Sequence, residues 1–107
     1  MPTPMNVDPQ VLATSSAEVH AASQRFVAAH AGAAAAIEAA LAGWVGLSRA
    51  AMSDTVAHWA GSTVAVATRM AEHADALAVI GRAFATMDAR HAAHLAAVRA
   101  AAEIPCR

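Results

Sequence analysis

The chain has 107 residues, of which 58% are apolar, and its seven arginines nearly balance its eight acidic residues. This length accommodates one domain with a small core. Much of the apolar fraction is alanine, which favours helix and adds little side-chain area. The balanced charge and the absence of lysine argue against a nucleic-acid-binding protein. One cysteine, Cys106, excludes an intramolecular disulfide and a cysteine-based metal site.

The first seven residues contain two prolines and show no apolar periodicity, so the sequence predicts a disordered lead over residues 1–7. They also lack the charged and apolar regions of a Sec signal peptide, so we expect any export to use another route. Asp8 and Pro9 then predict a helix start. Asp8 can accept hydrogen bonds from free backbone N–H groups, and Pro9 suits the first helical position.

A first helix is predicted over about residues 9–42, because its larger residues recur at nearly seven-residue intervals. The repeat consists of Leu12, Val19, Phe26 and Ala33, followed by Ile37 and Leu41. The alanine-rich stretch from residue 31 to residue 47 contains Glu38 and falls short of the roughly 20 residues of a membrane span. We therefore expect no stable membrane insertion.

Two glycines lie close together near the middle of the chain. Gly43 and Gly46 enclose Trp44 and a valine, and this pattern predicts a turn over residues 43–47. Ser48 follows directly and is expected to cap the next helix with its hydroxyl group.

The second half carries the most regular pattern, with apolar or seam-facing residues spaced alternately by four and three positions. These residues are Met52, Val56, Trp59, Thr63, Val66, Met70, His73, Leu77, Ile80, Phe84, Met87 and His91. They predict one long helix over about residues 48–103, followed by a tail over 105–107. Gly61 and Gly81 lie inside this helix, where they either lower its stability or allow another helix to approach closely.

Two long helices joined by a tight turn must lie antiparallel, which predicts an all-α helical hairpin as a single domain over residues 8–104. A register with Trp44 opposite Met52 places Leu12 near Phe84 and leaves the end of the second helix overhanging. The expected pairing seam consists of Leu12, Val19, Phe26, Ile37, Trp59, Met70, Leu77 and Ile80. Because two helices leave apolar faces uncovered, we expect a homodimeric or heterodimeric four-helix bundle.

Side chains that could carry chemistry do not form a known catalytic or metal-binding pattern. His91 and His94 share a helix face, but two ligands are too few for a protein zinc site. The sequence lacks a Gly-x-Ser-x-Gly motif and a glycine-rich phosphate loop. Ser15, Ser16 and Ser23 are expected to face solvent or bond back to the preceding turn. We predict a protein without enzymatic activity, metal or cofactor.

Trp44-Val45-Gly46, at the turn of a hairpin of about 100 residues, resembles the Trp-x-Gly signature of the WXG family. Members of this family are exported by type VII (ESX) secretion machinery. Trp59 follows the turn as a second tryptophan does in many relatives. Val7-Asp8-Pro9 followed by Leu12 resembles the start of related ESX secretion-associated proteins. The resemblance covers about residues 7–98.

The family resemblance implies a bipartite export signal. One part is the turn signature, here Trp44 and Gly46, and the other is a Tyr-x-x-x-Asp/Glu motif on the second helix. Phe84 and Asp88 stand at the matching positions, with phenyl in place of phenol, and share one helical face. Phe84 could equally be a seam residue, with Asp88 simply solvated.

The resemblance also implies what the chain does. It predicts a non-enzymatic secretion substrate that is made in the cytoplasm and reaches the exterior or cell surface without a signal peptide. Its implied partners are another helical hairpin and a type VII secretion ATPase or chaperone. The alternative hypothesis is a cytoplasmic or lipid-surface helical scaffold. Lipid-surface helices usually have a basic polar face, whereas here Arg69 neighbours Glu72, which favours protein pairing.

Overall fold

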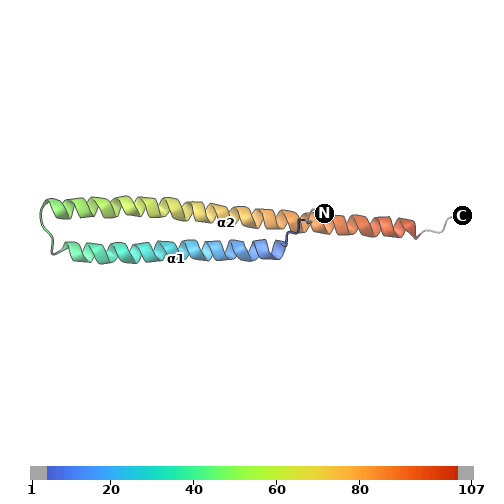
Figure 1. The fold of residues 1–107 in the computed structure, drawn as a ribbon, viewed down its shortest axis with the longest axis horizontal. Coiled ribbons are helices and arrows are strands. Elements are labelled where there is room, and N and C mark those ends of the chain that lie inside the picture. The colour runs from blue at the N-terminus through green and yellow to red at the C-terminus, as the bar shows by residue number, and fades with distance from the viewer. Residues whose placement is uncertain (1–4, 104–107) are drawn as a thin grey trace.

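The computed structural model describes residues 5–103, which form two helices and no strand. Helix α1 spans Pro9–Leu41 and helix α2 spans Leu47–Ala102. They run antiparallel side by side, as Figure 1 shows, so the prediction of an all-α hairpin is confirmed. The expected tail and Cys106 lie outside the described residues, as does most of the expected disordered lead.

The start of α1 follows the sequence signal. Asp8 has an extended backbone, and its carboxylate accepts a 2.8 Å hydrogen bond from the N–H group of Gln10. Pro9 occupies the first helical position, where its missing N–H group leaves no intrahelical bond unmade. A side-chain cap of this kind stabilises a helix by about 1 kcal/mol.

The connection between the helices is short and depends on one glycine. α1 ends with two bonds of the 3₁₀ type, from the N–H of Gly43 to the oxygen of Ala40 (3.2 Å) and from the N–H of Trp44 to the oxygen of Leu41 (3.0 Å). Gly46 then takes a φ of +73° with a ψ of −146°, and among residues 5–103 it alone has a positive φ. This conformation reverses the chain and is open mainly to glycine.

The expected cap at Ser48 is wrong. Because Gly46 completes the reversal, α2 begins at Leu47, and Ser48 lies inside its first turn. Gly46 occupies the capping position without a side chain, and its carbonyl oxygen accepts a 3.3 Å bond from the N–H of Ala50.

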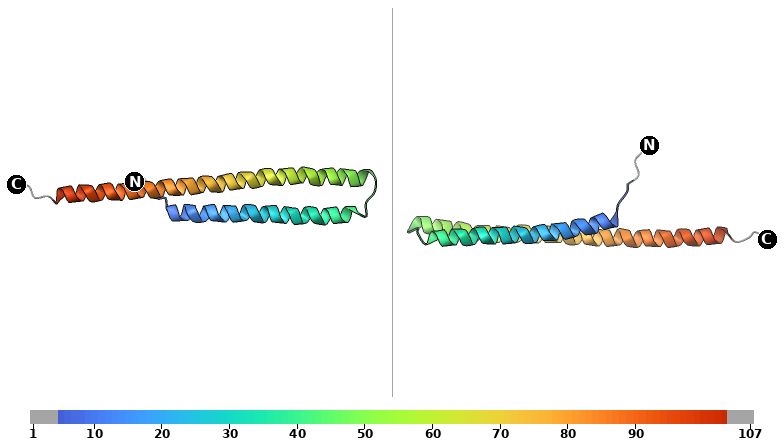
Figure 2. Two further views of the ribbon diagram at one scale, coloured as in Figure 1. Left: turned by 180° about the vertical axis from the view of Figure 1, so that it is seen from behind. Right: turned by 90° about the horizontal axis from the view of Figure 1, so that it is seen from below.

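The helices differ greatly in length. α1 has 33 residues and α2 has 56, so they extend for about 50 Å and about 84 Å at 1.5 Å per residue. Figure 2 shows α2 continuing well beyond the start of α1. Every residue from 85 to 103 is exposed. We call residues 85–102 the overhang.

The hairpin has almost no core of its own. Among the described residues, the buried positions are Ser16, Ser23, Leu41, Val56, Ala74 and Gly81. No large side chain is fully buried there, whereas many valine, leucine, isoleucine, methionine and tryptophan side chains are exposed. Such a surface is typical of a protein that buries further area against a partner.

Candidate interaction surface and turn

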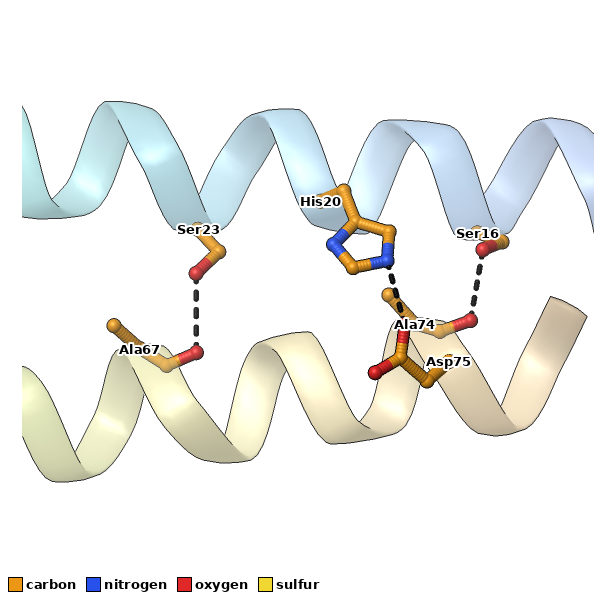
Figure 3. Close-up of polar contacts among 6 residues, drawn as sticks. All are labelled: Ser16, His20, Ser23, Ala67, Ala74 and Asp75. Atoms are coloured by element: carbon orange, nitrogen blue, oxygen red, sulfur yellow. Dashed lines mark hydrogen bonds and ion pairs between the residues drawn. The ribbon is translucent and has the colours of Figure 1, made fainter.

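The helices approach closely where the first half of α1 meets the middle of α2. The Ser16 hydroxyl donates a 2.7 Å hydrogen bond to the carbonyl oxygen of Ala74, and the Ser23 hydroxyl donates a 3.0 Å bond to that of Ala67 (Figure 3). Both serines are buried. Direct bonds from a side chain on one helix to the backbone of the other require that the residues between the axes be small. We call this region the closed end.

Gly81 extends the closed end to the first turn of α1. A Cβ atom added to Gly81 would lie 3.2 Å from the Cβ of Leu12 and 3.4 Å from the carbonyl oxygen of Pro9. Close helix approach, one of the two roles predicted for the glycines of α2, is therefore confirmed at Gly81. The same atom at Gly61 would meet nothing within 4 Å, so Gly61 does not serve a close approach of α1.

Two sequence-based expectations fail at the closed end. Ser16 and Ser23 neither face solvent nor bond to the preceding turn, because the carbonyl groups of α2 lie within reach. The expected register is also wrong, since it pairs Ser16 with Ile80, more than one helical turn from Ala74. The missed signal is the seven-residue spacing of small residues, shared by Ser16 and Ser23 and by Ala67, Ala74 and Gly81.

The helices leave an open groove near the turn. It has a volume of about 530 Å³ and lies between residues 26–37 of α1 and 56–66 of α2. Its lining is almost entirely apolar and includes Phe26, Val27, Ile37, Val56, Trp59 and Val66. We call it the turn groove. Trp59 is 50% exposed at its edge, so a large indole surface is available to a partner.

The predicted pairing seam divides into two groups. Six of its members are half-buried: Leu12, Val19, Phe26, Ile37, Met70 and Leu77. Trp59 and Ile80 are exposed, Ile80 by 44%. The hairpin alone therefore does not cover these two residues, and their role in pairing stays a prediction.

The turn presents an apolar tip. Trp44 is 44% exposed, and Val45 and Leu47 are 85% and 90% exposed. The predicted signature residues Trp44 and Gly46 thus lie at an accessible end of the molecule, with Gly46 fixing the backbone reversal.

The second predicted motif lies far from the turn. Phe84 is half-buried, Asp88 is exposed, and one helical turn separates them at the beginning of the overhang. About 55 Å of α2 separates Phe84 from the turn, at 1.5 Å per residue. One hairpin therefore does not bring Phe84 and Asp88 together with Trp44 and Gly46.

The polar groups of the described residues offer little chemistry. His20 and Asp75 lie 3.0 Å apart across the helices (Figure 3), but both side chains are well exposed, so their contribution is small. Within residues 5–103, no group of three or more His, Cys, Asp or Glu side chains is arranged to hold a metal ion. Neither helix, over its described length, is long and apolar enough to cross a membrane.

Comparison with known protein families finds a match over most of the chain. A family model described as proteins of 100 residues with WXG matches residues 4–89. The matched segment includes the turn with Trp44 and Gly46 as well as Phe84 and Asp88. No curated protein and no solved structure matches the chain.

Proposed function

The chain belongs to the WXG100 family, and from this membership we propose that it is a non-enzymatic substrate of a type VII (ESX) secretion system that pairs with another helical hairpin. The observation that carries the proposal is the position of Trp44-Val45-Gly46. The three residues form the turn itself, and Gly46 has a backbone conformation that favours glycine.

The distance between the two motifs supports a paired secretion substrate. Trp44 and Gly46 lie at the turn, while Phe84 and Asp88 lie where the overhang begins. If two hairpins pair with opposite orientations, the turn of one comes beside the overhang of the other. The export signal then becomes a composite surface built by two chains. A secretion ATPase or chaperone would bind that surface through the exposed Asp88 carboxylate and the indole of Trp44.

The lining of the turn groove supports binding rather than catalysis. Apart from His30, Ser62 and Thr63, its residues are apolar. Apolar grooves between helices suit a helix of another protein, which contributes apolar residues at intervals of three and four.

Secretion from an ESX-competent host tests the proposal. A tagged wild-type chain is compared with Asp88→Ala and with the wild type in a strain lacking the secretion ATPase. Export should be lost in that strain and should fall strongly for Asp88→Ala. Glu72→Ala is the matched control, because Glu72 is also an exposed carboxylate of α2 and lies outside the motif. A protein that stays inside the cell in every case would reduce the function to a cytoplasmic pairing module.

A further inference from the structure

Four residues of α2 repeat at intervals of seven and form one stripe along the helix. They are Ala67, Ala74, Gly81 and Asp88, which we call the contact stripe. The first three contact α1, because the carbonyl oxygens of Ala67 and Ala74 accept its hydrogen bonds and Gly81 lies against its first turn. Asp88 has the position of a fourth contact, yet it is exposed. The carboxylate of the second predicted motif therefore lies on the side of α2 that a longer α1 would cover.

The place where α1 begins explains why Asp88 is free. Gly81 lies beside Leu12 and Pro9, and Pro9 is the first residue of α1. The next position of the contact stripe is about 10 Å further along α2, where no α1 residue remains to meet it. Figure 2 shows α2 continuing alone from this point. Continued backward as a helix, α1 would bring residue 5 beside Asp88, because the two are seven positions from Leu12 and Gly81.

The sequence fixes this end of α1. Pro9 has no N–H group to continue the helix, and its ring disfavours a helical conformation of the preceding residue. That residue, Asp8, is extended and caps the first turn with its carboxylate. The hydrogen bonds of Ser16 and Ser23 to α2 also set the position of α1 along the contact stripe. As a result, α1 neither grows nor slides toward Asp88.

The early end of α1 leaves apolar surface uncovered. Phe84 is only half-buried, and Leu95, seven positions after Asp88, is 66% exposed. A longer α1 would bury part of this surface and add stability. The sequence instead encodes a firm stop, which fits a functional need for the uncovered side. Building on the proposed function, we propose that Pro9 is a positioning residue of the export signal. It ends α1 at Gly81 and so keeps the carboxylate of Asp88 open to the secretion ATPase or chaperone.

A helix extended past Pro9 tests the proposal. Residues 5–8 are replaced by alanine in two variants, one of which also carries Pro9→Ala. Because alanine favours helix, α1 should extend to residue 5 in the variant with Pro9→Ala. The other variant is the matched control, since its proline still opposes helix at the preceding residue. Circular dichroism should show added helix only with Pro9→Ala, and thermal unfolding should show no loss of stability in that variant.

Alkylation of a cysteine at position 88 measures whether the extended helix covers the contact stripe. In a Cys106→Ser background, Asp88→Cys should react several-fold more slowly in the variant with Pro9→Ala than in its control. Thr86→Cys is the reference site, because residue 86 is exposed and lies about 200° from residue 88 around α2. Its rate should be the same in both variants. An equal rate at position 88 would show that Pro9 does not keep the stripe open, and would overturn the inference.

Secretion of the two variants, with Asp88 intact, tests the functional part. The control that keeps Pro9 should be exported like the wild type. Export of the variant with Pro9→Ala should fall several-fold, although this variant is more helical and at least as stable. A fall of that kind does not come from unfolding. Equal export of the two variants would overturn the inference.

Failure of this inference is distinguishable from failure of the proposed function. If the wild type is exported and the two variants are exported equally, the role given to Pro9 is wrong and the secretion role stands. If the wild type stays in the cell, the proposed function is wrong, and the alkylation rates show separately whether Pro9 sets the end of α1.

Discussion

The closed end and the turn groove are built by the same two helices, yet they differ in almost every respect. At the closed end the facing residues are small, and hydroxyl groups of α1 bond directly to the backbone of α2. Near the turn the facing residues include Phe26, Ile37 and Trp59, and a space of about 530 Å³ stays open. Small side chains let two helices complete their own contact, whereas large ones hold the axes apart and require a third element to cover them.

This difference separates two roles along one hairpin. The closed end sets the register of the helices, because Ser16 and Ser23 each have a defined acceptor on α2. The turn end leaves its larger apolar side chains available for a partner. Added side-chain volume should therefore destabilise the closed end and be tolerated near the turn.

The largest effect is expected from adding volume at the closed end. Ala74 is fully buried, so Ala74→Leu forces the helices apart, breaks the bond from Ser16 and lowers the free energy of unfolding by about 1–3 kcal/mol. Ala60 lines the turn groove and is exposed, so Ala60→Leu has room and should change stability little. Thermal unfolding followed by circular dichroism compares them, and equal losses would refute the distinction between the two ends.

A loss of about 1–2 kcal/mol is expected for Gly46→Ala, because the φ of +73° is strained for any residue with a Cβ atom. Gly43→Ala is the matched control in the same turn. Gly43 has no positive φ, and an added Cβ would make only an ordinary 3.7 Å contact with the oxygen of Ala40. Urea unfolding measures both variants. If Gly43→Ala were the more harmful, the turn would not depend on Gly46.

Removing one interhelical hydrogen bond should cost about 1 kcal/mol. Ser16→Ala and Ser23→Ala each delete a buried hydroxyl that bonds to a carbonyl group of α2. Ser62→Ala is the comparison, since Ser62 lies exposed beside the turn groove. Urea unfolding of the three variants should give losses at Ser16 and Ser23 and almost none at Ser62. Equal values would mean that the interhelical bonds do not contribute to stability.

The smallest effect is a contrast between two glycines of α2. Gly61→Ala should stabilise the protein by up to about 1 kcal/mol, because alanine favours helix and the added Cβ meets nothing within 4 Å. Gly81→Ala gains the same propensity but pushes its Cβ against Leu12 and Pro9, so its net gain should be smaller or negative. A greater gain at Gly81, measured by thermal unfolding, would show that the closed end tolerates wider spacing.

Local signals in the sequence were sufficient to predict the elements of the fold. Asp8 and Pro9 mark the start of α1, and Gly46 marks the reversal, because capping and positive φ depend on a few neighbouring residues. The long seven-residue repeat in the second half predicted α2, and the greater length of this repeat predicted the overhang.

The register could not be predicted in this way, because it depends on which side chains allow close approach. The predicted register was set by placing Trp44 opposite Met52, which assumes that large residues form the contact between the helices. The contact is instead made by Ser16, Ser23 and Ala74, which carry little hydrophobic signal. Because large apolar residues were assigned to the seam, Trp59 was included in it, although Trp59 is half exposed in the single hairpin.

The fluorescence of Trp59 tests most directly whether the turn end is completed by another helical hairpin. In a Trp44→Phe variant, Trp59 is the only tryptophan, and it is 50% exposed in the single hairpin. Its emission should shift to shorter wavelength when the protein pairs with another hairpin, because a partner helix in the turn groove covers the indole and removes it from water. Sedimentation identifies the conditions under which the protein is paired. If the emission stays at the wavelength of a solvated indole under those conditions, this account is contradicted.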